Sequence, residues 1–366
     1  HAYGGFGMYD EENDQVYPDF LEKTKESSLG VVRYPGGTIA NLFTWKDTIG
    51  PRAERSNVVL GNNYASVFPY YGLDEHMRYT EDIGEVLYMV GEAAETPAGA
   101  ADLVEYMNAP NDGSNPGGGT DWAAVRAQNG HPEPYDVIYY EIGNEMYIDS
   151  QMYWLTLPSV FGETGSKVRV KGTWADNLSR GQAGETFYTQ YNPVVEGTET
   201  VYVNGEKWTR TDDLQTARSA EQVYEFDYKT GEIRFGDGKH GVIPPQNAPV
   251  TADYQHKHAG FIEYYEAMKA VDPDIKIFST LPFVYNFVPS DKCDGIVYHD
   301  YIGYPKNLTT PGEVHDGFMT VSDQLVQAID KNVTDLRNKS GRNDTIPAVT
   351  EFGTLDVSRV YSEDPS

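Results

Sequence analysis

The stretch LGVVRYPGG, residues 29–37, predicts a β-strand that ends in a Pro-Gly-Gly turn. Beyond it, the spacing of apolar residues predicts a helix over residues 73–83, a strand over 86–90, a helix over 98–107 and a strand over 135–142. Strands that alternate with helices are typical of a parallel sheet covered by helices. The first 160 residues are therefore predicted to have an α/β structure.

A different pattern occupies residues 165–255. Short β-rich runs alternate there with turn pairs such as Asn204-Gly205, which favour tight hairpins, and no long helical pattern occurs. After this stretch the strand and helix patterns return. We therefore expect residues 1–164 and 256–366 to form two pieces of one α/β domain, with residues 165–255 as an inserted all-β domain, because loop closure costs grow slowly with length.

Charge and composition exclude several classes of protein. The chain has 366 residues, with 28 basic and 56 acidic side chains and a formal charge of −28. A field this negative repels phosphates and argues against nucleic acid as a partner. No apolar run approaches the roughly 20 residues of a membrane span. The single cysteine, Cys293, excludes an internal disulfide, and the start at His1 suggests a processed or cut-down product.

Two glutamates follow predicted strands of the α/β pieces. Glu145 ends the run YEIGNE, and Glu351 ends the run AVTE. In a β/α barrel the C-terminal ends of the strands open onto one face, so we expect both carboxyl groups in one cleft. Such a pair suits glycoside hydrolysis, with carboxyl groups about 5 Å apart for retention and near 9 Å for inversion. Asn144 could bond a sugar hydroxyl. A helix cap or a solvated loop charge is the simpler interpretation of either glutamate alone.

Several motifs, in this order, resemble glycoside hydrolase family 51, the α-L-arabinofuranosidases. They include RYPGG at residues 33–37, IGP at 49–51, YGLDE at 71–75, the helical run AADLVEYMN at 100–108, and EIGNE at 141–145. The resemblance covers residues 1–155 well and 255–355 more loosely. It implies a (β/α)8 barrel of the TIM type and a retaining mechanism.

The resemblance also implies roles for single residues. Glu145 is similar in position to the general acid/base and Glu351 to the nucleophile, and Asn144 to the residue that bonds the sugar 2-hydroxyl. The stretch YHDY at 298–301 resembles the His-x-Tyr motif of the family, so Tyr301 would steady the nucleophile and His299 would line the sugar site.

Arg33 and Trp45 each have two interpretations. Arg33 would sit beneath the nucleophile and favour its ionised form, or serve only as a buried ion-pair partner. Trp45 would stack on a sugar face, or pack in the core.

Departures from the family pattern leave the exact sugar open. Gly91 stands where the family has Asn, and Phe352 follows the second glutamate where the family has Trp. The chain also ends soon after Glu351, so we expect a barrel without its last β/α unit, completed by further domains or by a second chain. An endo-acting hydrolase of β-linked glycans and a non-catalytic carbohydrate-binding or structural subunit are the alternatives.

Two segments are expected near the mouth of the barrel. The Gly- and Asn-rich loop at residues 111–120 is interpreted as a rim segment. The insert leaves the barrel shortly after Glu145 and carries Trp208 and Tyr224, so it is interpreted as a lid or glycan-gripping domain, with a spacer or an oligomer contact as the alternative.

No cofactor and no metal are expected. Asp237 and neighbouring acids could bind calcium, but no ordered ligand loop occurs and a solvated acidic face is the better interpretation. The expected partner is an oligo- or polysaccharide, with a homo-oligomer left open, and the expected location is outside a bacterial cell.

Overall fold

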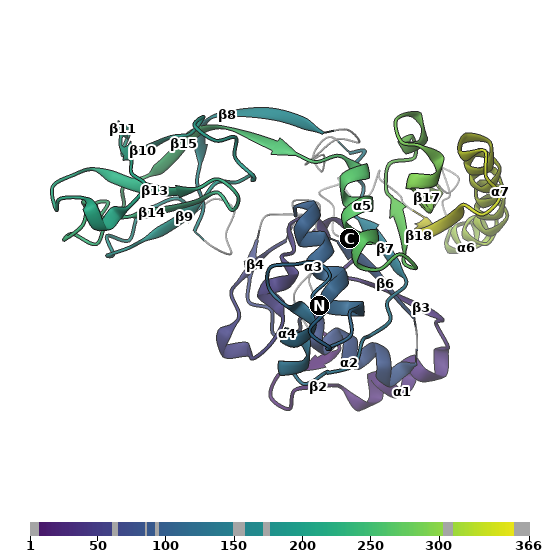
Figure 1. Cartoon of the computed structure of the whole chain (residues 1–366). Helices are drawn as coiled ribbons and strands as arrows, with labels where there is room; N and C mark the ends of the chain where they lie inside the picture. Colours follow the sequence, from purple (N-terminus) through teal and green to yellow (C-terminus); the bar gives the residue numbers. More distant parts are fainter. Residues whose placement is uncertain are drawn as a thin grey trace. The chain divides into compact units, whose positions relative to one another are not determined.

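The computed structural model describes residues 7–60, 65–84, 86–91, 95–148, 158–170, 176–302 and 310–354. The chain divides into two compact units, His1–Ile275 and Lys276–Ser366. Each unit contains parallel strands and helices, and the first also contains the β-rich insert. Figure 1 labels these elements along the chain.

The first unit contains three parallel strands: β3 (Val31–Tyr34), β6 (Val86–Gly91) and β7 (Tyr139–Ile142). Arg33 pairs with Tyr88, and Tyr88 with Tyr139, so one register runs across the three strands. The helices of this unit are α1 (Pro18–Ser27), α2 (Leu73–Ile83), α3 (Pro97–Asn108), α4 (Trp122–Gln128) and α5 (Phe261–Val271). Short strand pairs are formed by β1 (Tyr9–Asp10) with β2 (Gln15–Val16) and by β4 (Val58–Val59) with β5 (Ser66–Val67).

The ends of these helices follow from local chemistry. The α3 helix begins after Thr96, whose hydroxyl accepts a hydrogen bond from the Gly99 N–H at 3.1 Å, and Pro97 occupies its first turn. The α2 helix ends at Gly84, which adopts a left-handed conformation with φ of 70°. The glycine explains why α2 ends where the predicted range 73–83 ends.

The segment at residues 111–120 lies away from the predicted rim. The buried carboxylate of Glu105, in the last turn of α3, accepts hydrogen bonds from Gly117 N at 2.7 Å and Trp122 N at 2.9 Å. At the end of the same helix, Asn108 exchanges two hydrogen bonds of 2.8 Å with Val137, just before β7 begins. The loop is therefore held at the N-terminal edge of the strands. The rim interpretation was wrong because the loop follows a helix, whereas the loops of a catalytic face follow strands.

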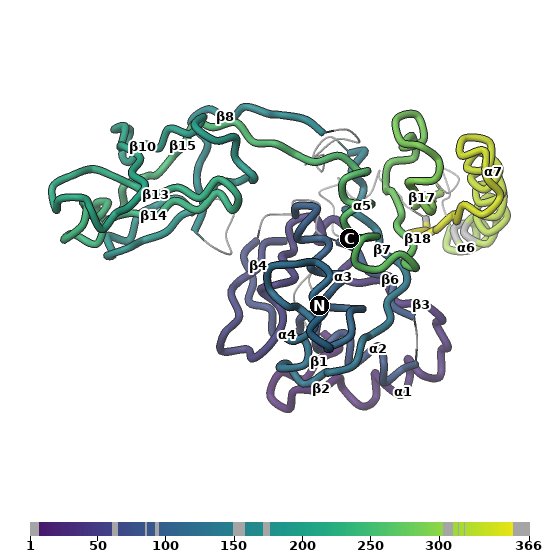
Figure 2. Tube along the Cα trace, viewed as in Figure 1, coloured from purple at the N-terminus to yellow at the C-terminus, as the bar shows by residue number. Residues whose placement is uncertain are grey.

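The insert is a β-sandwich of two four-stranded sheets, ordered β11-β10-β15-β8 and β12-β13-β14-β9. Its strands are β8 (Ser159–Lys167), β9 (Thr186–Tyr188), β10 (Thr200–Val203), β11 (Glu206–Lys207), β12 (Thr209–Arg210), β13 (Val223–Asp227), β14 (Glu232–Phe235) and β15 (Val250–His258). β8 and β15 pair along most of their length and extend beyond residues 165 and 255, the predicted limits of the insert. Their course can be followed in Figure 2. The domain boundaries themselves stay a prediction.

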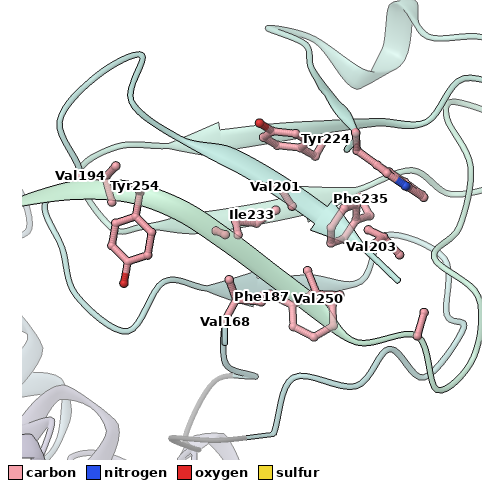
Figure 3. Packing of buried hydrophobic residues seen from close by; sticks show 13 residues of the cluster. Val168, Phe187, Val194, Val201, Val203, Tyr224, Ile233, Phe235, Val250 and Tyr254 are labelled. Carbon is pink, nitrogen blue, oxygen red and sulfur yellow. The ribbon is translucent and has the colours of Figure 1, made fainter. Parts of the chain in front are cut away.

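The sandwich core explains the alternating pattern of its strands. Every second residue of β15 is buried, and the buried side chains include Val250 and Tyr254. They meet residues of the other sheet such as Phe187 and Phe235 (Figure 3). Trp208 belongs to this core and is 2% exposed.

The aromatic residues that suggested glycan gripping are therefore core residues. Tyr224, like Trp208, is only 2% exposed within the sandwich. Their burial removes the aromatic ground for the glycan-gripping interpretation, because neither ring is available to stack on a sugar, and the lid role stays a prediction.

The second unit contains three parallel strands: β16 (Lys276–Ser279), β17 (Gly295–Ile302) and β18 (Ile346–Thr354). Its helices are α6 (Pro311–Met319) and α7 (Val321–Ser340), and α7 packs against β17 and β18. β17 begins at a glycine for a steric reason. A Cβ on Gly295 would meet the carbonyl oxygen of Ile346 at 2.1 Å, so a side chain there would push the two strands apart.

Candidate functional site

The first group of predicted residues lies at the C-terminal end of β7. The strand ends at Ile142, and Gly143 turns the backbone with φ of 71°. Glu145 also has a positive φ, 49°, which costs energy for a residue with a side chain. Strain of this kind at a strand end is common in functional sites, where it aims a side chain that a regular strand could not present.

An ion pair inside the sheet positions this strand end. Arg33 on β3 donates to Oε2 of Glu141 on β7, from Nε at 3.2 Å and from Nη2 at 3.0 Å. Glu141 is fully buried, and the Arg33 side chain is 14% exposed. Of the two roles kept open for Arg33, the structure shows the buried ion pair.

Arg33 also orients Asn144. Its Nη2 donates to Oδ1 of Asn144 at 2.8 Å. A guanidinium can only donate, so the amide oxygen must face Arg33 and the amide nitrogen must face the other way. Asn144 is 1% exposed, and no acceptor among the described residues lies within hydrogen-bonding distance of its Nδ2. That N–H group suits a hydroxyl oxygen of a ligand.

The backbone of Asn144 is fixed by a second asparagine. Asn41 donates from Nδ2 to the Asn144 carbonyl at 2.9 Å and accepts from the Asn144 N–H at 2.7 Å. Asn41 is fully buried, in the 3-10 turn Thr38–Leu42 that follows β3. The backbone N–H and C=O groups of Asn144 are therefore both satisfied without regular sheet pairing.

The carboxyl group of Glu145 is partly exposed and meets a tyrosine. Tyr147, two residues further on, places its hydroxyl 3.3 Å from Oε1 of Glu145. The carboxyl thus lies at the surface of the unit, where it can exchange a proton with a ligand or with water.

Of the two interpretations of Trp45, sugar stacking and core packing, the structure supports core packing. It is 2% exposed, and its ring lies 5.3 Å from that of Tyr106 and 5.0 Å from that of Trp122, measured between centroids. The ring has too little free surface to stack on a sugar, so we assign it to the core.

The second group of predicted residues lies on β17 and β18. Tyr301 donates to Oε2 of Glu351 at 2.7 Å. His299 places Nδ1 at 3.6 Å from the same oxygen, and its side chain is 2% exposed. Both side chains come from β17 and approach the carboxylate on β18, the strand that pairs with it in parallel.

Four neighbours of these residues were missed in the sequence. Asn41, Glu141, Tyr147 and Thr350 each contact a predicted site residue. Glu141 carried a signal, since a charged residue inside an apolar strand needs a buried partner. The partners of Asn41 are fixed only by the path of the loop between β3 and α2, which no local pattern records.

The acids that suggested calcium are engaged in turns and ion pairs. Asp237 accepts from the N–H groups of Lys239 and His240, and these bonds lower its pKa to about 2. Asp212 pairs with Arg210, and Asp227 accepts from Lys229 N at 2.8 Å. These contacts agree with a solvated acidic face.

Comparisons with known proteins point to one family. Residues 24–163 match the family model described as the alpha-L-arabinofuranosidase 1 domain. Probable alpha-L-arabinofuranosidase C of Aspergillus clavatus is 32% identical over 147 residues, which cover 38% of this chain and 28% of the relative. An extracellular exo-alpha-L-arabinofuranosidase of Streptomyces chartreusis is 27% identical over 247 residues, which cover 55% of this chain and 28% of the relative.

A solved structure shares the fold. A family 51 alpha-L-arabinofuranosidase from Bifidobacterium longum matches 98% of this chain and 55% of its own, with a TM-score of 0.57 and 16% identity. The chain thus spans about half of that structure and about a quarter of the curated relatives. Among the described residues, no helix is long and apolar enough to cross a membrane.

These findings confirm the predicted resemblance and fold class. The chain is a family 51-like, α-L-arabinofuranosidase-like protein. Its fold is a partial (β/α)8 barrel with additional β elements.

Proposed function

We propose, from the family 51-like character of this chain, that the protein is a retaining glycoside hydrolase that cleaves arabinofuranosyl linkages. Glu351 is the nucleophile and Glu145 the general acid/base. Named arabinofuranosidases among the relatives support the substrate class. The environment of each glutamate supports its role.

The observation that carries the assignment of Glu351 is the hydroxyl of Tyr301, which donates to one of its oxygens, with an imidazole nitrogen of His299 near the same oxygen. Tyr301 and His299 both face Oε2, at 2.7 and 3.6 Å. Donors stabilise the ionised form of a carboxyl group, which is the form that attacks.

The observation that supports Glu145 is its place beside a prepared hydroxyl site. Asn144 is held at its side chain by Arg33 and at its backbone by Asn41, so its Nδ2 has a fixed direction. We assign this N–H group to the 2-hydroxyl of the bound sugar. The neighbouring carboxyl of Glu145 would then lie at the glycosidic oxygen.

The reaction takes two displacements. In the first, Glu351 forms a bond to the anomeric carbon, the glycosidic C–O bond breaks, and Glu145 gives its proton to the leaving oxygen. In the second, Glu145 takes a proton from water, the water oxygen bonds to the anomeric carbon, and the carboxylate of Glu351 is released. No cofactor is needed in either step.

The substrate and the location follow from the same assignment. We propose an oligo- or polysaccharide substrate that carries arabinofuranosyl groups. The extracellular relative supports action outside the cell, on polymers that do not cross membranes. We further propose that other domains or a second chain complete the barrel. A homo-oligomer of this chain is one arrangement that would supply the second chain.

The test uses the full-length protein and an aryl α-L-arabinofuranoside. Glu351→Gln should lower kcat by about 10⁴-fold or more, because the step that it removes has no substitute. Glu145→Ala should retain the first step on a glycoside with a good leaving group but slow the second, and added azide should restore turnover and yield the arabinosyl azide with retained configuration. Glu133→Gln is the matched control, because Glu133 is an exposed carboxylate in the unit that contains Glu145. Binding of arabinan without turnover by the unaltered protein would instead indicate a binding subunit.

A further inference from the structure

A β-bulge lies next to the proposed nucleophile. Tyr298 on β17 faces Val349 on β18, but the next residue, His299, faces Glu351, so Thr350 is an extra residue in β18. In a regular strand two successive side chains point to opposite faces. A bulge changes this direction, and bulges are frequent beside active sites.

The bulge brings two side chains of β18 to the same imidazole. The Oγ1 of Thr350 lies 3.1 Å from Nε2 of His299, and the Oε2 of Glu351 lies 3.6 Å from Nδ1. The His299 side chain is 2% exposed, so neither nitrogen is open to bulk water.

The chemistry of these partners favours one tautomer. A carboxylate only accepts hydrogen bonds, so the nitrogen that faces Glu351 is favourable when it carries the proton. In neutral histidine the other nitrogen, Nε2, is then an acceptor. The hydroxyl of Thr350 can donate to it. A buried acceptor without a donor would be unfavourable.

We propose that Thr350 is a positioning residue of the nucleophile. The carboxylate of Glu351 favours the tautomer with the proton on Nδ1, and the hydroxyl of Thr350 donates to Nε2 in that tautomer, which holds the ring with an N–H group facing Glu351. The link to catalysis rests on the proposed function. The tautomer itself follows from the contacts of β17 and β18.

The opposite tautomer would work against the nucleophile. With the proton on Nε2, the lone pair of Nδ1 would face the carboxylate, and two acceptors would repel each other in a site of low polarity. Glu351 would then be held on Oε2 by Tyr301 with an acceptor rather than a second donor beside it. Thr350 gives the other nitrogen, Nε2, a partner in a fixed place, because its position in the bulge is defined by the pairing of the strands.

The first test measures the tautomer without any substrate. The protein is labelled with ¹⁵N-histidine, and long-range ¹H–¹⁵N spectra assign a state to each of its eight histidines, with His299→Gln identifying the signal. The proposal expects a protonated Nδ1 and an unprotonated Nε2 in the unaltered protein. A neutral ring with the proton on Nε2 would overturn it.

The second test compares Thr350→Val with Thr350→Ser. Valine keeps the shape and the β-branch but loses the hydroxyl, whereas serine keeps the hydroxyl. Thr350→Val should leave Nε2 of His299 without this partner, so that the ring is held less firmly beside Glu351, and should lower kcat for the aryl arabinofuranoside about 10- to 100-fold with little change in KM. Thr350→Ser should stay within about threefold of the unaltered protein and keep the Nδ1-protonated spectrum.

A double variant separates positioning from general disruption. If Thr350 acts through His299, Thr350→Val should cost little more activity once His299→Gln is present. Full additivity, or a Thr350→Val variant with unchanged spectrum and unchanged kcat, would overturn the proposal. An Nδ1-protonated ring in a protein that hydrolyses no glycoside would refute the proposed function and leave the tautomer assignment standing.

Discussion

The Arg33–Glu141 pair offers a sharp test of how the site is held. Replacing Arg33 with Met keeps an unbranched apolar stem on β3 and removes the guanidinium that bonds Glu141 and Asn144. The carboxylate of Glu141 then remains at zero exposure without its cation. Asn144 also loses the donor that fixes the direction of its amide.

The size of the effect follows from this burial. Breaking a buried ion pair by removing one partner costs about 3–5 kcal/mol, because the remaining charge is desolvated and uncompensated. We therefore expect Arg33→Met to lower the free energy of unfolding by that amount. Adding Glu141→Gln removes the stranded charge and should recover about 2 kcal/mol or more. The exposed pair Lys23–Glu26 gives the control: Lys23→Met should change stability by at most about 1 kcal/mol.

Urea unfolding followed by tryptophan fluorescence measures these energies. All five tryptophans lie in the unit that contains the pair, so the signal reports its unfolding. A loss below about 1 kcal/mol for Arg33→Met, or losses that simply add in the double variant, would refute the argument that this pair is a coupled structural element.

Two further variants test other parts of the description. Glu105→Gln keeps one acceptor for the backbone N–H groups of Gly117 and Trp122 but turns an amide NH2, which cannot accept, toward the other, so that bond is lost and urea unfolding should show a loss of about 1–2 kcal/mol. Its activity should be unchanged, and a tenfold drop in kcat/KM would contradict the placement of this loop at the N-terminal edge. Burial lowers the pKa of His258 from its usual value near 6.5 to about 4. The unfolded chain therefore binds the extra proton between these values, and stability should fall by at most about 3 kcal/mol as the pH drops from 6.5 to 4. His258→Phe should reduce that slope, whereas an equal slope in His258→Phe and in the exposed control His315→Gln would contradict it.

Local signals predicted the elements well where the chain itself fixes them. The α2 helix matches its predicted range because Glu75 caps the N–H of Gly72 and a left-handed glycine, Gly84, ends it. The strands of the insert were predicted from alternation, since a two-sheet sandwich buries one face of each strand. Which strands pair, however, depends on contacts between distant segments. The sequence pattern therefore could not distinguish a sandwich core from a ligand surface, and Trp208 was misjudged for this reason.

The site residues stay a prediction, and the residues that support them were not predicted. Asn144 and Glu145 follow β7 and Glu351 lies near the C-terminal end of β18, positions that the strand patterns alone indicate. Asn41 and Thr350 act through a loop path and a bulge, and neither leaves a periodic trace in the sequence. A one-residue bulge is a property of strand pairing, which tertiary structure decides.

The most direct test of the central claim is to trap the sugar on the enzyme. In Glu145→Ala, an aryl arabinofuranoside with a good leaving group still reacts without an acid, but the following hydrolysis lacks its base and the intermediate accumulates. Digestion and mass spectrometry of the full-length protein should then find one pentosyl group on the peptide that contains Glu351, and none after Glu351→Gln. A pentosyl group on a different carboxylate, or turnover with inverted configuration and no adduct, would contradict the account.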